Sequence, residues 1–276
     1  MNSKNSILLV DPAFDPNTTD ACRLLIKLSA DNFSYAIIDV ASNQLKVLYD
    51  QQECENPSLD LADKLDSDEY LALSFQEVKA SIFTLNTLLV PNDLYDSQQL
   101  TDYGKYFTVQ QSNILHVQSD ADYNLTSVFN LATFIEKKLT NKFSNCKFYN
   151  HISPLLALAK NTSDKTIFLD FTVGSVNAAY LENGNLIFQN YFEISNAEEF
   201  NYYLLFMVNQ LNIEAAVASI SVSGVIHEGD KIYQIIGKYF TSISFAIPVN
   251  QTLEKQITND LPANYYSSLL AIDICE

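Results

Sequence analysis

The residues that most often bind metals or act as nucleophiles are few and widely spaced in this sequence. The chain has three histidines and four cysteines, which are His116, His151, His227, Cys22, Cys54, Cys146 and Cys275. No histidine has a second histidine or cysteine three or four residues away, and no two cysteines have a Cys-x-x-Cys spacing. Metal sites and disulfide frameworks bring such residues close together. We therefore expect neither a metal site nor a disulfide framework.

Carboxylates are the other groups that could do chemistry. Four aspartates lie in turns or near the ends of apolar runs, and they are Asp31, Asp39, Asp50 and Asp170. Together they could form a carboxylate cluster that cleaves nucleic acid with two metal ions. Ordinary roles in turns and at strand ends explain them more simply. The sequence also lacks a Gly-x-Ser-x-Gly elbow and a glycine-rich Lys-Ser/Thr phosphate loop, so we expect no catalytic residues.

The charge of the chain argues against anionic partners. Sixteen basic and 33 acidic residues give a formal net charge of −17, which repels phosphate backbones and anionic membrane surfaces. The apolar run at residues 7–10 is too short for a signal peptide or a membrane anchor. We expect a reduced, cytoplasmic protein that neither binds nucleic acid nor inserts into a membrane.

The elements that must position any site begin with residues 165–194, which predict three consecutive strands. Their apolar residues alternate or run together, and turns fall at residues 172–175 and 182–185. Asn183 and Gly184 favour a two-residue hairpin turn, because both tolerate positive φ. Residues 23–52 repeat the design, with strands predicted over residues 24–28, 33–40 and 45–49. Each half of the chain therefore contains an antiparallel meander.

Helix-separated strands are predicted after each meander. In the first half we expect an extended lead-in over 1–20, a surface loop over 53–66, a helix over 67–80 with Ser67 as N-cap, a strand over 81–90, a short helix over 92–103, a hairpin within 113–129, a helix over 128–142, a strand over 146–149 and a helix over 153–160. In the second half we expect a helix over 196–211, a strand over 216–222, a helix over 228–239, a strand over 242–247 and a C-terminal helix that Pro262 opens.

The same order of elements thus occurs twice. Three antiparallel strands followed by helix-separated strands make a mixed sheet with helices on both faces, because each crossover is right-handed and covers a face. We expect the α/β class, with one domain over residues 1–160 and a second over residues 161–276. The C-terminal helix is free to pack back on the first domain, and a cleft is expected between the two.

Three stretches match a known group of proteins. They are Leu-Ser-x-Asp-x-Phe-Ser at 28–34, Leu-Val-Pro-x-x-Leu-Tyr at 89–95, and the end of the chain at 261–276. With these stretches the sequence resembles the actin-like ATPase superfamily, whose members pair two ribonuclease-H-like domains around a nucleotide. More narrowly, it resembles a bacterial family of unknown function with that fold.

The resemblance implies where a nucleotide would be held. Superfamily members place an Asp-x-Gly-x-x loop between the first two strands of each domain, where amides grip phosphates and aspartates hold Mg²⁺ through water. In the second half Asp170 matches the aspartate, but Thr172 takes the glycine position and Gly174 comes two residues late. In the first half Lys27 takes the aspartate position and Ser29 the glycine position.

The adenosine-binding strand end of the superfamily normally carries paired glycines. Residues 221–226 of this chain keep only Gly224, after Ser223, and a valine takes the second position. With six glycines in 276 residues, the chain has little material for two phosphate loops and a purine shelf. If a nucleotide is bound, the resemblance places five residues around it: Asp170, Thr172, Gly174, Ser223 and Gly224. Turn and strand-end roles explain Asp170 and Gly224 more simply.

These observations favour a degenerate, non-catalytic member of the superfamily. We expect a scaffold or regulatory binding protein without a cofactor, whose partner is another protein and which could form a homodimer. The alternatives are a Mg-ATP-dependent ATPase or phosphotransferase that uses the inter-domain cleft, and a small-molecule sensor. The pairs Tyr202-Tyr203 and Tyr265-Tyr266 indicate core packing with one half-exposed ring each, or a partner surface near Tyr202 or Tyr266.

Overall fold

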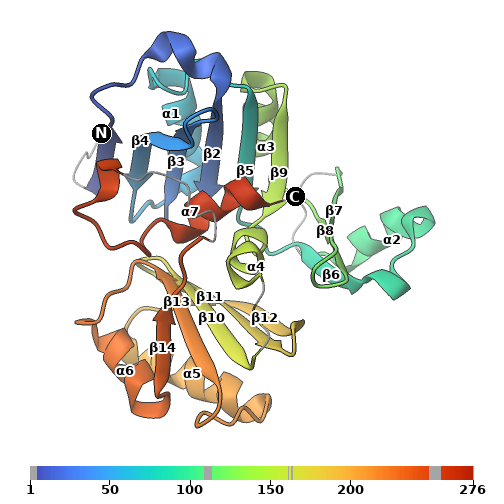
Figure 1. The fold of residues 1–276 in the computed structure, drawn as a ribbon. Coiled ribbons are helices and arrows are strands. Elements are labelled where there is room, and N and C mark those ends of the chain that lie inside the picture. Colours follow the sequence, from blue (N-terminus) through green and yellow to red (C-terminus); the bar gives the residue numbers. More distant parts are fainter. Residues whose placement is uncertain (1–4, 109–113, 161, 163, 249–255, 276) are drawn as a thin grey trace. The chain divides into compact units, whose positions relative to one another are not determined.

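A computed structural model describes residues 5–108, 114–160, 162, 164–248 and 256–275. The chain divides into two compact units. The first consists of Met1–Ser153, Thr252–Ile257 and Ile272–Glu276, and the second consists of Pro154–Gln251 and Thr258–Ala271. Each unit has its own sheet and its own hydrophobic core (Figure 1). No single sheet runs through both predicted meanders, as the duplicated fold requires.

The first unit contains a six-stranded sheet with the order β1-β4-β3-β2-β5-β9. Its strands are β1 (Ser6–Val10), β2 (Cys22–Leu28), β3 (Phe33–Asp39), β4 (Gln44–Gln51), β5 (Glu77–Ile82) and β9 (Cys146–Asn150). The first predicted meander is confirmed as β2, β3 and β4, which pair antiparallel. β5 and β9 extend the sheet in parallel. Helices α1 (Pro57–Ser67) and α3 (Thr133–Lys142) precede β5 and β9, as parallel crossovers require.

The second unit contains a five-stranded sheet with the order β12-β11-β10-β13-β14. Its strands are β10 (Thr166–Phe171), β11 (Ser175–Glu182), β12 (Asn185–Glu193), β13 (Ser219–Gly224) and β14 (Ser242–Phe245). Its helices are α4 (Ser153–Ala159), which starts at the last residue of the first unit, α5 (Ala197–Gln210), α6 (Lys231–Tyr239) and α7 (Ser267–Ala271). The order matches β4-β3-β2-β5-β9 of the first unit position for position. The predicted duplication is therefore confirmed at the level of sheet topology.

A small third sheet interrupts the first unit between β5 and α3. It has the order β6-β8-β7, with β6 (Thr87–Pro91), β7 (His116–Asp120) and β8 (Leu125–Phe129). The predicted hairpin within residues 113–129 is confirmed as β7 and β8. The helix predicted over 92–103 is wrong for most of its length. The chain there forms the 3₁₀ turns η3 (Asn92–Leu94) and η4 (Ser97–Gln99), then the short helix α2 (Leu100–Tyr103) and η5 (Gly104–Tyr106), none of which buries a residue.

Apolar stripes on the helices cover one face of each large sheet. In the first unit Leu61 and Leu65 of α1 and Leu139 of α3 are buried in a core with β2 and β5. In the second unit Phe200 and Leu204 of α5 pack in a core with β10, β11 and β13. Spacings of three and four residues place these side chains on one helix face. The predicted helix over 196–211 is confirmed.

Two predictions near the N-terminus of the first unit are wrong. Residues 1–20 are more than an extended lead-in, because β1 pairs antiparallel with β4 and η2 (Pro16–Ala21) follows. The predicted surface loop over 53–66 contains α1, which the Asn56 side chain caps by accepting from the Leu59 amide. Asp63 and Asp66 of this stretch are exposed on a helix whose inner face carries Leu61 and Leu65.

The helix predicted over 67–80 is also wrong. The carboxylate of Asp68 accepts hydrogen bonds from the amides of Tyr70 and Leu71, which closes a turn directly after α1. The chain then enters β5 at Glu77. The helical spacing of apolar residues in this segment reflects a turn that packs Leu71 and Phe75 into the core rather than a helix.

The end of the chain belongs to the first unit. After α7, the 3₁₀ turn η7 (Ile272–Ile274) contacts β5. The buried ammonium group of Lys79 donates to the backbone carbonyls of Asp273 and Cys275, at 2.8 Å each. Arg23 Nη1 lies 3.1 Å from Asp273 Oδ1, and the Tyr149 hydroxyl donates to the Cys275 carbonyl at 3.2 Å. Three polar side chains of the unit, those of Lys79, Arg23 and Tyr149, therefore hold its last described residues in place.

Within the described part of the chain, the helices are all too short or too polar to cross a bilayer.

Candidate functional site

Three polar side chains meet where the central strand of the second unit ends. Asp170, the second-last residue of β10, pairs with Asn177 of β11 and with Ser223 of β13. Residues that are directly paired across strands point to the same face of a sheet. This face is opposite the α5 and α6 core, to which the neighbouring Leu169 and Phe171 belong. The three polar residues are 3%, 7% and 1% exposed, so the cluster is buried.

The carboxylate of Asp170 already has a partner in the fold. The Ser223 hydroxyl donates to Asp170 Oδ1 at 2.7 Å. Asn177 Oδ1 is buried and accepts no hydrogen bond from the residues that the structure describes. A buried acceptor without a partner is uncommon and costs free energy. Asn177, which sequence reasoning missed, is therefore the member of this cluster with spare bonding capacity. Its only sequence signal is its place in the alternation of β11.

The turn between β10 and β11 is closed by its own side chains. The Thr172 amide donates to the Ser175 carbonyl at 3.0 Å, and the hydroxyl oxygens of these residues are 2.7 Å apart. Only Val173 and Gly174 lie between them, and the Gly174 carbonyl accepts from the Ile194 amide. Among the described glycines, those with positive φ are Gly184 and Gly224, so Gly174 does not use the glycine-specific conformation. A turn this short does not offer the run of amides that cradles a phosphate.

Glycine is required at position 224 because the backbone of β10 lies close to the turn that follows β13. Its φ is +79°, and a Cβ atom added there would lie 2.0 Å from the carbonyl oxygen of Phe171. The Asn264 side chain holds this turn, since its Nδ2 donates to the carbonyls of Gly224 and Ile226 at 3.1 and 2.9 Å. Asn264 was not predicted, because it lies 40 residues away and no local pattern links it to the strand end.

The corresponding position of the first unit is a lysine. Lys27 is the second-last residue of β2 and pairs with Ser34 of β3 and Ser81 of β5, as Asp170 pairs with its neighbours. It is only 8% exposed. Burial and the nearby charge of Lys27 lower the pKa of His151 to about 3, so that this imidazole is neutral at neutral pH. The register thus sets Lys27 where the second unit has an aspartate.

The remaining candidates are dispersed. Asp31, Asp39 and Asp50 belong to the first unit and Asp170 to the second. Asp39 has a turn role, because its carboxylate accepts from the amide and hydroxyl of Ser42. No group of three or more His, Cys, Asp or Glu side chains in the described ranges could hold a metal ion.

The cysteines are poor nucleophiles. Burial raises the pKa of the Cys22 thiol to about 11 and those of Cys54, Cys146 and Cys275 to about 12. The thiolate, which is the reactive form, is therefore scarce at neutral pH.

One of the two tyrosine pairs has the predicted arrangement, with one ring packed and its neighbour exposed. Tyr203 of α5 stacks on Phe192, with ring centroids 4.7 Å apart, while Tyr202 is 62% exposed. Tyr265 and Tyr266 are both half-buried. Tyr202 lies beside the exposed Phe206 on the same helix.

Comparisons with known proteins agree with this fold. A family model described as "Protein of unknown function (DUF3822)" matches residues 11–243. A solved protein with actin-like ATPase fold and unknown function from Bacteroides thetaiotaomicron is 18% identical, with a TM-score of 0.77 over 95% of this chain and 99% of that chain. No curated protein matches.

Two further solved structures are similar at lower identity. A PilM-PilN type IV pilus biogenesis complex has 8% identity and a TM-score of 0.59, over 91% of this chain and 97% of that chain. The ethanolamine utilization protein EutJ from Carboxydothermus hydrogenoformans has 9% identity and a TM-score of 0.52, over 97% and 93%. At these identities the likeness concerns the fold, and the predicted actin-like, ribonuclease-H-like fold is confirmed.

Proposed function

The chain belongs to the DUF3822 family of proteins of unknown function, and we propose that it is a non-catalytic actin-like protein that acts by binding another protein. The proposal depends on how the residues at the nucleotide position of the superfamily are used in this chain. Each of them is engaged in local structure or replaced by a residue of unsuitable chemistry.

The observation that carries the proposal is which residues occupy the two matching strand-end positions, one in each unit. Superfamily members hold Mg²⁺ with aspartates from both domains. Here one position is Lys27, whose cation repels a metal ion, and the other is Asp170, which is 3% exposed and hydrogen-bonded to Ser223. A magnesium ion with its water shell needs several oxygen ligands and space around them. The residues present do not fit a bound Mg-nucleotide.

The purine position supports the same view. Gly224 leaves no room for a Cβ atom, because the Phe171 carbonyl occupies that space. Its backbone amide donates to the Asn264 carbonyl at 2.9 Å. The glycine that resembles a purine shelf thus serves the packing of two strands and a turn.

A binding role agrees with the charge and with one structural neighbour. Loss of nucleotide chemistry leaves the fold as a scaffold, and the net charge of −17 suits a basic protein partner. The PilM-PilN complex is a two-protein assembly that contains a chain of similar fold. We propose a protein partner for this chain too, which could be a second copy of the chain in a homodimer.

One observation favours the alternative, a Mg-ATP-dependent ATPase or phosphotransferase. Asn177 Oδ1 lies on the same sheet face as the Asp170 carboxylate and accepts no hydrogen bond from the described residues. Two acceptors side by side could receive a donor such as a metal-bound water. A residual site would therefore involve Asp170 and Asn177.

Calorimetric titration with Mg-ATP separates the two functions. For the binding protein we expect no magnesium-dependent heat in the micromolar range and no thermal shift. A micromolar response that disappears in Asp170→Ala and in the milder Asp170→Asn would overturn the proposal. Val173→Ala is the matched control, since this side chain is exposed on the neighbouring turn and forms no part of the polar cluster.

A further inference from the structure

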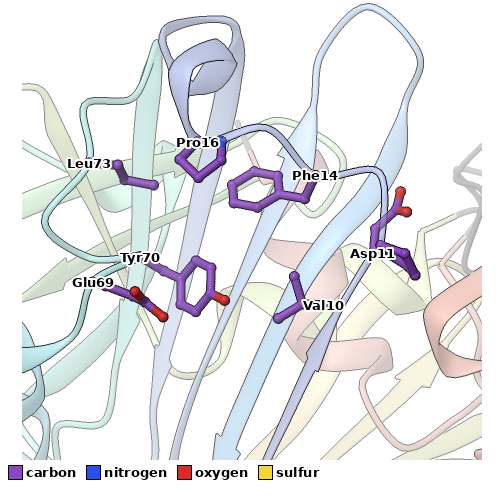
Figure 2. A pocket seen from close by; sticks show the side chains of 8 residues that line it. Val10, Asp11, Phe14, Pro16, Glu69, Tyr70 and Leu73 are labelled. Atoms are coloured by element: carbon purple, nitrogen blue, oxygen red, sulfur yellow. The ribbon is translucent and has the colours of Figure 1, made fainter.

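The first unit has an open pocket of about 460 Å³ between the end of β1 and the turn that follows α1. Six of its lining side chains decide its chemistry, and they are Val10, Asp11, Phe14, Glu69, Tyr70 and Leu73. Figure 2 shows the aromatic rings and the two aliphatic side chains around the hollow, with the carboxylates of Asp11 and Glu69 on opposite sides of it. The volume lies within the range of small-ligand sites.

The apolar part of the pocket is a pair of rings. Phe14 and Tyr70 have centroids 6.0 Å apart with their planes tilted by 45°. Both side chains are half-buried against the core of the first unit, and so are Val10 and Leu73. The faces of aromatic rings carry partial negative charge and attract cations. The pocket thus combines an apolar wall with a surface that favours positive charge.

The charged part of the pocket is acidic. Asp11 is bound on one side by Lys46, with Nζ 2.7 Å from Oδ2, and on the other by the Ala13 amide. Glu69 is exposed and forms no ion pair with any residue of the described chain. Burial, then the charges of Glu69 and Asp68, raise the pKa of the Tyr70 phenol. Added negative charge is therefore disfavoured at this place.

The turn that carries Glu69 and Tyr70 is held in place by the hydrogen bonds and the ion pair of Asp68. Asp68 Oδ1 accepts from the amides of Tyr70 and Leu71 and from the Tyr35 hydroxyl, while Lys64 Nζ lies 2.9 Å from Asp68 Oδ2. These contacts are buried or half-buried, so the pocket is formed before any ligand arrives. A preformed site spends less of its binding free energy on ordering side chains.

We propose that this pocket binds an arginine side chain of the protein partner. A guanidinium group is flat and weakly hydrated, so its face can stack on Phe14 and Tyr70 while its N–H groups reach the free carboxylate of Glu69. Lysine fits less well, because its ammonium is a strongly hydrated point charge that does not stack. The inference rests on the proposed function, since it names the chemistry by which the partner is recognised.

The test is a titration with N-acetyl-arginine amide, followed by amide chemical shifts in NMR. N-acetyl-citrulline amide has nearly the same shape without the charge. We expect saturable shifts at residues of the β1 end and of the Glu69–Tyr70 turn, and binding of citrulline weaker by at least about tenfold, the loss of one charge-assisted hydrogen bond. Binding should also weaken as salt is added, because the pocket is open to solvent.

Two variants and one control sharpen the result. Glu69→Gln and Tyr70→Leu should each weaken the arginine probe, the first by removing charge and the second by removing a ring. Glu228→Gln makes the same charge change at an exposed residue of the second unit and should have no effect. Equal affinity for the arginine and citrulline probes, shifts outside the pocket, or no saturable binding would overturn the proposal.

This outcome is independent of the Mg-ATP titration. Absence of both responses would remove the arginine pocket and leave the non-catalytic function in place. A Mg-ATP response together with arginine binding would remove the non-catalytic function and leave the pocket.

Discussion

At the scale of single residues, the features that resemble a nucleotide site are used to build the strand end itself. Asp170 accepts from Ser223, Thr172 bonds to Ser175, and Gly224 lies against the Phe171 carbonyl. A buried polar group must find a partner within the fold. These residue types therefore have structural roles at this strand end.

Gly224 gives the clearest prediction at this scale. Gly224→Ala should lower the free energy of unfolding by about 3 kcal/mol or more, because the new Cβ atom meets backbone oxygen in addition to an unfavourable φ. Gly184→Ala is the matched control. Gly184 has a similar φ of +77° but no atom within 4 Å of an added Cβ, so it should cost only about 1–2 kcal/mol.

Urea unfolding of the second unit measures both variants. Equal losses for Gly224→Ala and Gly184→Ala would mean that the turn after β13 relaxes around the added methyl group, and that the close contact with Phe171 is not decisive.

At the scale of elements, the stretch between β4 and β5 shows how a polar side chain redirects the chain. Residues 67–80 have apolar residues at helical spacing. The Asp68 carboxylate nevertheless accepts hydrogen bonds from the amides of Tyr70 and Leu71, and these bonds stabilise a turn. The same carboxylate accepts from the Tyr35 hydroxyl at 3.0 Å, and Tyr35 is fully buried. The turn is thereby tied to the centre of β3, which no local pattern reveals.

Asp68→Ala should destabilise the first unit by about 3 kcal/mol or more, since it leaves a buried hydroxyl and two amides without their acceptor. Tyr35→Phe in the same chain should recover part of this loss, because it removes the unsatisfied hydroxyl. A double-mutant cycle by urea unfolding should give a coupling free energy of about 1–3 kcal/mol between the two positions. Strict additivity would contradict the assigned hydrogen bond.

At the scale of the whole molecule, the chain is built from two copies of one sheet topology, and the first is completed by the last residues. Residues 272–275 belong to the first unit although they follow α7 of the second. Lys79 is 8% exposed and donates to two carbonyls of this segment. A buried ammonium is stable only where such acceptors replace its water.

Deletion of residues 272–276 should therefore destabilise the first unit by about 3 kcal/mol or more, as Lys79 loses charge-assisted hydrogen bonds. Amide hydrogen exchange of β5 and β9 should report the change. Lys79→Met should restore much of the protection in the shortened chain, because it removes the unpaired charge. Lys147→Met is the control, since Lys147 is an exposed neighbour paired with Glu77, and rescue by this variant would argue against the assigned role of Lys79.

Local sequence determined the two meanders, the hairpin turn at Asn183-Gly184 and most of the helices of the second half. The reason is physical, because alternation of apolar residues and turn chemistry act between neighbours in the chain. The matching order of strands in the two sheets follows from these local patterns together with the right-handed crossover rule. The duplicated α/β architecture could be predicted from the sequence for that reason, and the resemblance carried by residues 28–34, 89–95 and 261–276 indicated the actin-like fold.

Tertiary structure alone decided the features that depend on distant partners. Three contacts join residues far apart in the chain: β1 pairs with β4, Asn264 donates to Gly224, and Lys79 donates to Asp273. The same is true of the pocket formed by Phe14 and Tyr70. A polar group in a core forms its hydrogen bond with whichever residue the fold places near it. Because that residue can be anywhere in the chain, sequence spacing does not predict it.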